Sequence, residues 1–224
     1  MNKAFSSVKT IFFDVTDTLY SAPQIDAEHE KQLHSLIAGK HNISTDEAKA
    51  RLKEATQKLK ATERHVTKVR SMAEFGFTKD HVYNAFSKVN HASYLLEDPK
   101  LKEVLTVLNK KYKLGIISNY TYPLMVRIFK GLGLPENLFP FIVTADTVKE
   151  VKPAHEPFLK AIELAHVKPS ECLFVGDSPK KDMLPAKEVG MKTLLVSENP
   201  AAEDLKNADA YVMNVKEILS ILSH

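Results

Sequence analysis

The chain of 224 residues contains one cysteine and seven glycines, and both are low counts. A single cysteine excludes a disulfide framework within the chain and suits a reducing compartment. Cys172 lies in the apolar run 172–175, which indicates a buried thiol. The sequence has no G-x-G-x-x-G loop, no G-x-S-x-G elbow and no H-x-x-x-H pair. These absences exclude a Rossmann dinucleotide site, a hydrolase with a nucleophilic serine elbow and the common helical zinc site.

Long apolar runs and strong net charge are also missing. No stretch approaches the roughly 20 apolar residues that span a bilayer, and the apolar residues 11–13 are too short for a secretory signal and end at Asp14. The net charge is +3, without a long basic run, so a nucleic-acid partner is not favoured. Most of the lysine pairs, which include Lys180 and Lys181, are interpreted as solvated surface, while some could attract anionic substrates. We expect a cytoplasmic protein, a monomer or small homo-oligomer, with no membrane or nucleic-acid partner.

Hydrophobic periodicity divides the chain into three segments. Residues 9–14 are typical of a short buried strand. Residues 24–90 are rich in Ala, Lys, Glu and Leu, with a helix-start signal at Ser44 ahead of Glu47, and predict helices at about 25–39, 45–61, 63–75 and 79–92. Beyond Pro99, strands at 113–118, 141–144, 172–176, 192–196 and 210–213 alternate with helices at 100–111, 122–132, 155–166, 180–189 and 215–222.

This alternation predicts an α/β fold, with a doubly wound, mostly parallel sheet covered by helices on both faces. We expect residues 1–20 and 96–224 to form this core domain. Residues 21–95 should form a small, all-helical domain. Because parallel sheets of this kind bind ligands at the carboxyl ends of their strands, the residues that follow each strand are the candidates for function.

Polar side chains that could take part in a reaction follow several of these strands. Asp14 follows the first strand, Ser118 and Asn119 the second, and Asp177 and Asp182 the fourth, while Lys152 precedes the helix at 155. A carboxylate can attack phosphorus and form an acyl-phosphate, and Mg²⁺ bound by carboxylates can counter the repulsion between the two anions. A lysine ammonium can bridge the nucleophile and the phosphoryl oxygens, and a serine hydroxyl can donate a hydrogen bond to them.

The order and spacing of these groups resemble the haloacid dehalogenase (HAD) superfamily. Four stretches carry the resemblance: Asp14-Val-Thr-Asp-Thr-Leu, Ile116-Ile-Ser-Asn, Lys152-Pro, and Val175-Gly-Asp-Ser-Pro-Lys-Lys-Asp. They cover about residues 1–20 and 95–224. The helical insertion between them lies where the family's C1-type cap domain is found.

The resemblance implies an Mg²⁺-dependent phosphatase that hydrolyses small phosphomonoester metabolites through an aspartyl-phosphate. It implies that Asp14 is the nucleophile and that Ser118 and Lys152 hold the phosphoryl group. The magnesium ligands that it implies are the carboxylates of Asp14 and Asp177, the carbonyl of Thr16, and Asp182 directly or through water. The substrate-binding set that it implies is Thr16, Ser118, Asn119 and Lys152.

Thr16 departs from the family's pattern. Phosphatases of the family usually carry an aspartate there, which protonates the leaving group, whereas threonine is neither an acid nor a base near neutral pH. Three alternatives remain open: a phosphatase that is slow or selective for good leaving groups, a dehalogenase, and a weakened HAD-fold binding or regulatory protein. P-type ATPases resemble the first case, since they also have threonine at this position. The acidic pair Asp177 and Asp182 argues against a dehalogenase, which needs no metal.

Two further expectations concern the surroundings of the site. Asp17 replaces the usual glycine, which suggests that the loop does not require backbone angles reserved for glycine, and we interpret Asp17 as a turn or cap residue. His155 could line the site. Cap residues should decide the substrate, and the candidates for contact with an anion include Arg51, Arg64 and Arg70.

Overall fold

The computed structural model describes residues 3–63 and 65–222. Arg64 therefore lies outside the described residues. The chain divides into two compact units, one formed by residues up to Ser21 together with those from Leu95 onward, and one formed by Ala22–Tyr94. Within the described part, no helix has the length and apolar character required to cross a membrane.

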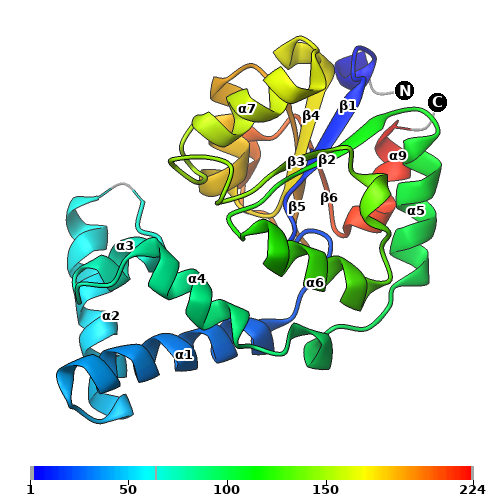
Figure 1. The fold of residues 1–224 in the computed structure, drawn as a ribbon. Coiled ribbons are helices and arrows are strands. Elements are labelled where there is room, and N and C mark those ends of the chain that lie inside the picture. The colour runs from blue at the N-terminus through cyan, green and yellow to red at the C-terminus, as the bar shows by residue number, and fades with distance from the viewer. Residues whose placement is uncertain (1–2, 64, 223–224) are drawn as a thin grey trace. The chain divides into compact units, whose positions relative to one another are not determined.

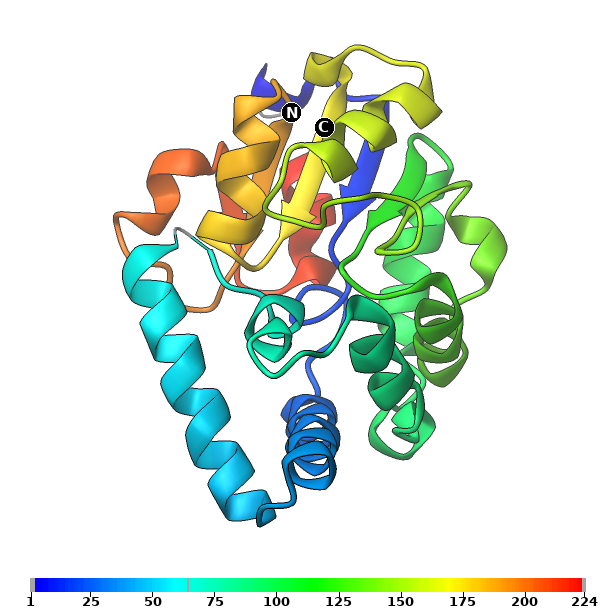
Figure 2. The same ribbon diagram turned by 60° about the vertical axis from the view of Figure 1, so that its left-hand side comes forward.

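The first unit is built on a six-stranded parallel sheet with the order β3-β2-β1-β4-β5-β6 (Figures 1 and 2). The strands are β1 (Thr10–Phe13), β2 (Lys113–Ile117), β3 (Phe141–Val143), β4 (Cys172–Gly176), β5 (Lys192–Val196) and β6 (Ala210–Val212). Every residue of β1 and β4 is buried, as expected for central strands that have helices on both faces. The predicted α/β fold with a doubly wound parallel sheet is confirmed.

Helices cover both faces of this sheet. They are α5 (Pro99–Asn109), α6 (Tyr122–Leu132), α7 (Glu156–Ala165), α8 (Leu184–Glu188) and α9 (Ile218–Leu222), with a π-helical turn, η5, at Pro179–Met183. One core cluster joins Phe158 of α7 and Ala186 of α8 to Phe12 and Phe174 of the sheet, while α5 and α9 lie on the other face (Figure 1). Proline stands in the first turn of several of these helices. A backbone N–H at that position would have no acceptor within the helix, so proline removes no helical hydrogen bond.

The second unit is all helical. It consists of α1 (Pro23–His41), α2 (Thr45–Thr62), α3 (Lys68–Ala73), α4 (Lys79–Ser87) and a 3₁₀ turn, η2, at His91–Tyr94. The third helix is shorter than predicted and begins at Lys68, because Glu63 is extended and the Thr67 hydroxyl caps the helix by accepting a hydrogen bond from the Arg70 N–H (3.0 Å). The fourth helix ends at Ser87, five residues earlier than predicted.

Two buried histidine rings pack together in this helical unit. His29 and His91 are both 1% exposed, and their Nε2 atoms lie 3.0 Å apart. The His29 ring also stacks on Phe86, with 4.1 Å between ring centroids. Burial, together with His91, lowers the pKa of His29 to about 3, so this ring is neutral in the folded protein at neutral pH.

Candidate active site

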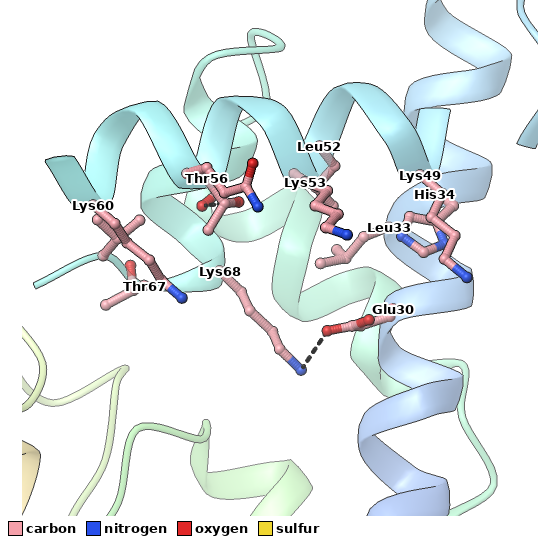
Figure 3. A pocket seen from close by; sticks show the side chains of 13 residues that line it. Glu30, Leu33, His34, Lys49, Leu52, Lys53, Thr56, Lys60, Thr67 and Lys68 are labelled. Carbon is pink, nitrogen blue, oxygen red and sulfur yellow. Dashed lines mark hydrogen bonds and ion pairs between the residues drawn. The ribbon is translucent and has the colours of Figure 1, made fainter. Parts of the chain in front are cut away.

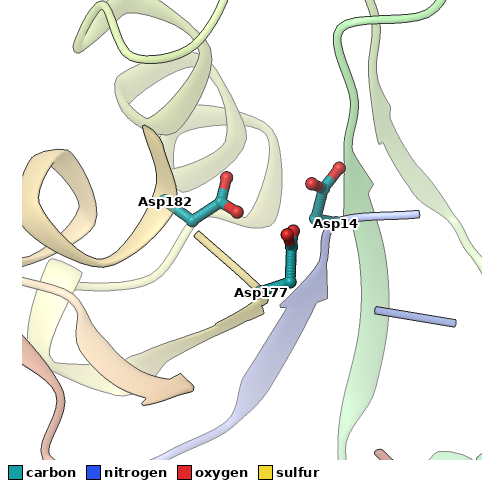
Figure 4. Close-up of side chains that lie close together, drawn as sticks. All are labelled: Asp14, Asp177 and Asp182. Atoms are coloured by element: carbon teal, nitrogen blue, oxygen red, sulfur yellow. The ribbon is translucent and has the colours of Figure 1, made fainter. Parts of the chain in front are cut away.

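The carboxyl ends of β1 and β4 place three aspartates together. Strand β1 pairs with β2 on one side and with β4 on the other, so the strand order reverses at β1, and residues following these strands emerge at one edge. Asp14 follows β1, and Asp177 and Asp182 follow β4. Their nearest carboxylate oxygens all lie within 4.8 Å of one another, and Figure 4 shows the three side chains converging from separate segments.

Lys152 supplies a fully buried ammonium to this cluster. Its Nζ lies 2.9 Å from Asp14 Oδ1 and 2.8 Å from Asp182 Oδ1, and it also lies over the ring of Phe174, 5.1 Å from the centroid. A buried ammonium is very costly unless it is paired and hydrogen-bonded. The two carboxylates therefore explain how a lysine can occupy this position, and the lysine explains how the carboxylates can approach each other.

Asn119 fixes the backbone of Lys152. Its Nδ2 donates to the carbonyl of Lys152 (2.9 Å), while the Lys152 N–H donates to Asn119 Oδ1 (2.9 Å). Both polar atoms of the Asn119 side chain, which was predicted to bind substrate, are thus hydrogen-bonded to the backbone of Lys152. Ser118, also predicted, is buried directly beyond β2, and its Oγ accepts a hydrogen bond from the Tyr120 N–H (3.2 Å).

Asp182 is held in place by its neighbours in the chain. Its Oδ2 accepts a hydrogen bond from the Ser178 N–H (3.2 Å), and its Oδ1 binds Lys152. Gly176 makes this position possible, because a Cβ on residue 176 would lie 2.8 Å from the Cβ of Asp182. Residue 176, directly before Asp177, therefore has to be glycine, because the side chain of Asp182 lies too close for a Cβ there.

Lys181 is a second ammonium in the site, and the sequence interpretation missed it. Its Nζ lies 3.4 Å from Asp14 Oδ2, and its side chain is 29% exposed. Solvated surface, the interpretation given to most of the lysine pairs, therefore fits Lys180, which is exposed, but not Lys181. Lys181 belongs to the π-helical turn η5, and its ammonium faces Asp14. Its position next to Asp182 in the fourth motif was the available signal.

The electrostatics of the cluster favour an ionised Asp14. Burial alone would raise its pKa, but the ammoniums of Lys152 and Lys181 and the N–H of Val15 outweigh that effect and hold the pKa below its usual value. For Asp177, burial is the largest cause and raises the pKa to about 7; Lys181 opposes this effect, whereas Asp182 and Asp14 add to it. Bringing a third carboxylate into this site therefore has an electrostatic cost.

A divalent cation fits this donor set. Among the described residues, Asp14 Oδ2 and Asp177 Oδ1 are buried oxygens without a hydrogen-bond donor. Three carboxylates face two ammoniums, so additional positive charge would stabilise the cluster. Oxygen donors of this kind are the ligands that Mg²⁺ and Ca²⁺ prefer. The arrangement can hold such a cation between Asp14 and Asp177.

The loop after Asp14 has an unusual backbone conformation at Asp17, where φ is 57°. This left-handed conformation is not reserved for glycine, in keeping with the expectation for this position. Aspartate tolerates the left-handed region better than most residues, since its short polar side chain bonds locally. Its exposed carboxylate accepts a hydrogen bond from Ser21 Oγ (2.8 Å), in agreement with the predicted turn role.

The hydroxyl of Thr16 stands where an acid was expected from the resemblance. Thr16 Oγ1 lies 3.4 Å from the hydroxyl of Tyr20, and the two residues also form an isolated β-bridge. His155, by contrast, has a half-exposed side chain, and its Nε2 lies 2.7 Å from Glu188 on the surface.

Two of the arginines considered for substrate contact are engaged in ion pairs within the helical unit. Arg51 binds Glu47 at 2.6 Å, and Arg70 binds Glu63 at 2.7 Å and Glu74 at 2.6 Å. These contacts join neighbouring turns or helices, and they give the two arginines a structural use.

Comparisons with known proteins agree with this geometry. Residues 8–190 match the family of haloacid dehalogenase-like hydrolases. The chain is 32% identical over 145 residues to pyrophosphatase PpaX of Bacillus mycoides (strain KBAB4), a match that covers 63% of this chain and 66% of that relative. It thus spans a little less than two thirds of the relative's length.

Two solved structures have the same fold over nearly the whole chain. One is the HAD phosphatase from Thermococcus onnurineus, with 25% identity, a TM-score of 0.75, and coverage of 96% of this chain and 98% of that one. The other is the 2-haloacid dehalogenase from Pseudomonas syringae pv. Tomato DC3000, with 22% identity, a TM-score of 0.66 and the same coverage; at this identity the likeness shows the fold alone. The chain belongs to the haloacid dehalogenase-like hydrolases.

Proposed function

We propose that the protein is an Mg²⁺-dependent phosphatase that hydrolyses small phosphomonoesters through an aspartyl-phosphate on Asp14. The observation that carries this proposal is the ionised carboxylate of Asp14, held between Lys152 (2.9 Å) and Lys181 (3.4 Å) beside the open oxygen of Asp177. A relative named as a pyrophosphatase and a neighbour titled as a phosphatase support a phosphohydrolase.

The geometry prepares Asp14 for nucleophilic attack. Its Oδ1 accepts hydrogen bonds from the Val15 N–H (2.8 Å) and from Lys152, which orients the carboxylate, while Oδ2 has only the more distant Lys181 ammonium beside it (3.4 Å). Attack forms a bond between Asp14 and phosphorus while the bond to the leaving oxygen breaks, and that oxygen leaves as an anion that takes a proton from solvent water. Water then attacks the phosphoryl group, releases inorganic phosphate and regenerates the carboxylate.

The other residues counter the negative charge of the phosphoryl group. Asp14, Asp177 and the carbonyl of Thr16 would hold Mg²⁺, with Asp182 acting through water because Lys152 and Ser178 already bind its oxygens. The metal would supply positive charge between the nucleophile and the substrate. The hydroxyl of Ser118, the Lys152 ammonium and backbone N–H groups beyond Asn119 would bind phosphoryl oxygens.

The helical unit, residues 22–94, acts in this proposal as a cap that selects small phosphorylated metabolites. The alternative is a weakened binding or regulatory protein, and Thr16 is the observation that favours it. A dehalogenase is disfavoured, because the acidic cluster and the unbonded oxygen of Asp177 have no use in metal-free chemistry.

Phosphate release from a panel of small phosphate esters and acetyl phosphate, with and without Mg²⁺, tests the proposal. The control is Asp14→Asn, which nearly preserves shape while removing the anionic nucleophile. We expect release that requires both Mg²⁺ and Asp14. No release from any substrate by the folded protein would transfer support to the binding-protein alternative.

The identity of residue 16 sharpens this test. We expect wild-type protein to prefer acetyl and aryl phosphates, because their leaving oxygens need no acid. Thr16→Asp should raise kcat for alkyl phosphates by about 10²-fold, at the lower end of the range for a positioned acid–base group, and should change aryl phosphate hydrolysis much less. The matched control is Thr16→Asn, which has the same shape and no proton to donate. An equal change in both variants would contradict the role assigned to position 16.

A further inference from the structure

The helical unit contains a pocket of its own. Helices α1 and α2 and the segment from Val66 to Ser71 enclose a volume of about 500 Å³, and Figure 3 shows the side chains that line it. The lining residues belong to residues 22–94. They are separate from the aspartates and lysines of the candidate active site.

One face of α2 brings three lysines to this pocket. Lys49, Lys53 and Lys60 are all exposed, and their spacing of four and seven residues places them along one side of the helix. The stretch from Lys49 to Lys60 spans about 16 Å at 1.5 Å per residue. In Figure 3 these side chains follow the helix from one end of the pocket to the other.

Two acidic residues of α2, Glu47 and Glu54, pair with cations other than the pocket lysines, and Asp46 forms no ion pair with those lysines. Glu47 binds Arg51 at 2.6 Å, and Glu54 binds Lys58 at 2.7 Å. In the described part of the chain, Lys49, Lys53 and Lys60 have no carboxylate oxygen within 4.0 Å. The helix therefore keeps its ion pairs away from the pocket and presents uncompensated ammoniums to it.

A fourth ammonium enters from the opposite wall. Lys68 Nζ lies 3.0 Å from Asp26 and 4.0 Å from Glu30, and Glu30 is the one carboxylate among the described lining residues. The floor of the pocket is apolar, formed by Leu33, Leu52 and Val66. The hydroxyls of Thr56, Thr67 and Ser71 and the amide of Gln57 add hydrogen-bonding groups.

An ordinary solvated helix face would also be charged, but two features distinguish this one. The lysines line a pocket that also has apolar residues, and among the described lining residues the lysines outnumber the single carboxylate, Glu30. Like charges that share a concavity repel one another, and an anion bound there would relieve that repulsion. Because the lysines extend over three helical turns, a ligand with several separated anionic groups satisfies them better than a monoanion does.

We propose that this pocket is a second binding site, for a small polyanion with several phosphate or carboxylate groups. His34 is the one aromatic ring among the described lining residues, and no Phe, Tyr or Trp is among them. None of the described lining residues is among the Asp14, Ser118, Lys152, Asp177 and Asp182 groups that act in the proposed phosphatase.

The test is a titration of the full-length protein with inorganic tripolyphosphate in Mg²⁺-free buffer at low salt, followed by the methyl resonances of Leu33, Leu52 and Val66. The variant Lys49→Gln/Lys53→Gln removes two pocket charges. The control Arg51→Gln/Lys58→Gln removes the same charge from the other side of the same helix. We expect the pocket variant to weaken binding reported by these methyl groups about tenfold, and the control to weaken it less than twofold.

Two outcomes would overturn the proposal. One is resonance changes confined to the core, which would mean that tripolyphosphate binds only there. The other is equal weakening by both variants, which would indicate a nonspecific effect of net charge. Thermal unfolding provides a check on folding, because removal of repelling lysines should leave the melting temperature of the pocket variant unchanged or higher.

Discussion

The two units of the molecule differ in whether their charged side chains are buried or exposed. The core unit buries Lys152 and Asp182 completely, and Asp14 is only 4% exposed. In the described part of the helical unit, the buried polar residues are His29, Ser71 and His91, and none of them is a lysine, arginine, aspartate or glutamate. The charges of that unit lie at its surface, where several form pairs one helical turn apart.

This difference follows from the cost of desolvation. A buried charge must have partners within hydrogen-bonding distance, so each change to the Asp14, Lys152 and Asp182 cluster leaves a remaining charge without compensation. An exposed ion pair contributes only about 0.2–1 kcal/mol. The core cluster is therefore expected to tolerate little change, while surface charges of the helical unit can vary and specify a ligand without loss of the fold.

The largest effect should follow from Lys152→Met. This change leaves Asp14 and Asp182 buried without the ammonium that separates them, and it should lower the free energy of unfolding by about 3–5 kcal/mol at pH 7. Urea denaturation gives the value. The matched control is Lys216→Met, since Lys216 lies 2.6 Å from Asp98 but both side chains are partly exposed, at 33% and 27%. That change should cost less than about 1 kcal/mol.

A similar loss from both variants would contradict the comparison. It would mean that a buried charge in the core cluster depends on its ion-pair partner no more than a partly exposed charge does. A loss from Lys152→Met that recovers at low pH, where the two aspartates become protonated, would sharpen the comparison by showing that repulsion between the carboxylates is the cause.

The next effect concerns the metal. If Asp14 and Asp177 bind Mg²⁺ only in the folded protein, then Mg²⁺ at 100 times its dissociation constant should add about 2.7 kcal/mol to the free energy of unfolding. Thermal unfolding with and without Mg²⁺ measures this. Asp177→Asn removes one anionic ligand and should abolish most of the shift. A shift of the same size in that variant would place the metal elsewhere.

Much of the core could be predicted from the sequence because its signals are local. Buried strands such as 172–176 are short apolar runs, and proline marks the start of α5 and α6. Once the strands are recognised as parallel, their carboxyl ends must share an edge, so the meeting of Asp14, Lys152, Asp177 and Asp182 follows from topology. The hydrogen bonds confirm that these groups lie together.

The features that were missed depend on backbone geometry that sequence patterns do not encode. Lys181 belongs to the π-helical turn η5 and its ammonium faces Asp14, whereas Lys180 beside it is exposed. The positive φ of Asp17 arises from a turn closed by its N–H donating to the Tyr20 carbonyl (2.6 Å), which joins residues that no periodicity links. The pocket of the helical unit likewise depends on how three segments pack.

The buried ring of His29 gives the helical unit a pH dependence. Because the pKa of His29 is about 3 in the folded protein and about 6.5 when unfolded, the unfolded chain binds more protons between these values. The free energy of unfolding should therefore decrease as pH falls below 6.5, by about 2 kcal/mol at pH 5 relative to pH 7. Lys68 adds to the lowering of the pKa, and Asp26 opposes it.

Amide exchange in α1 and α4 at pH 7 and pH 5 would measure this loss within the helical unit. The double variant His29→Leu/His91→Leu is the control, because it removes the titrating ring of His29 together with the ring that it contacts, while leaving the surface carboxylates unchanged. The difference between wild type and variant should appear at pH 5. Parallel curves for the two proteins would assign the acid sensitivity to other groups.

The smallest effect should come from the surface of the helical unit. Ser44 caps α2, where its hydroxyl accepts a hydrogen bond from the Glu47 N–H (3.1 Å). Ser44→Ala should lower the free energy of unfolding by about 1 kcal/mol, whereas Ser44→Gly should cost only a few tenths, because glycine lets water reach the free N–H groups at the helix start. Urea denaturation of the two variants separates these values. A loss of 3 kcal/mol or more from Ser44→Ala would contradict the view that polar surface contacts of this unit are individually replaceable, because it would match the loss expected from the buried Lys152.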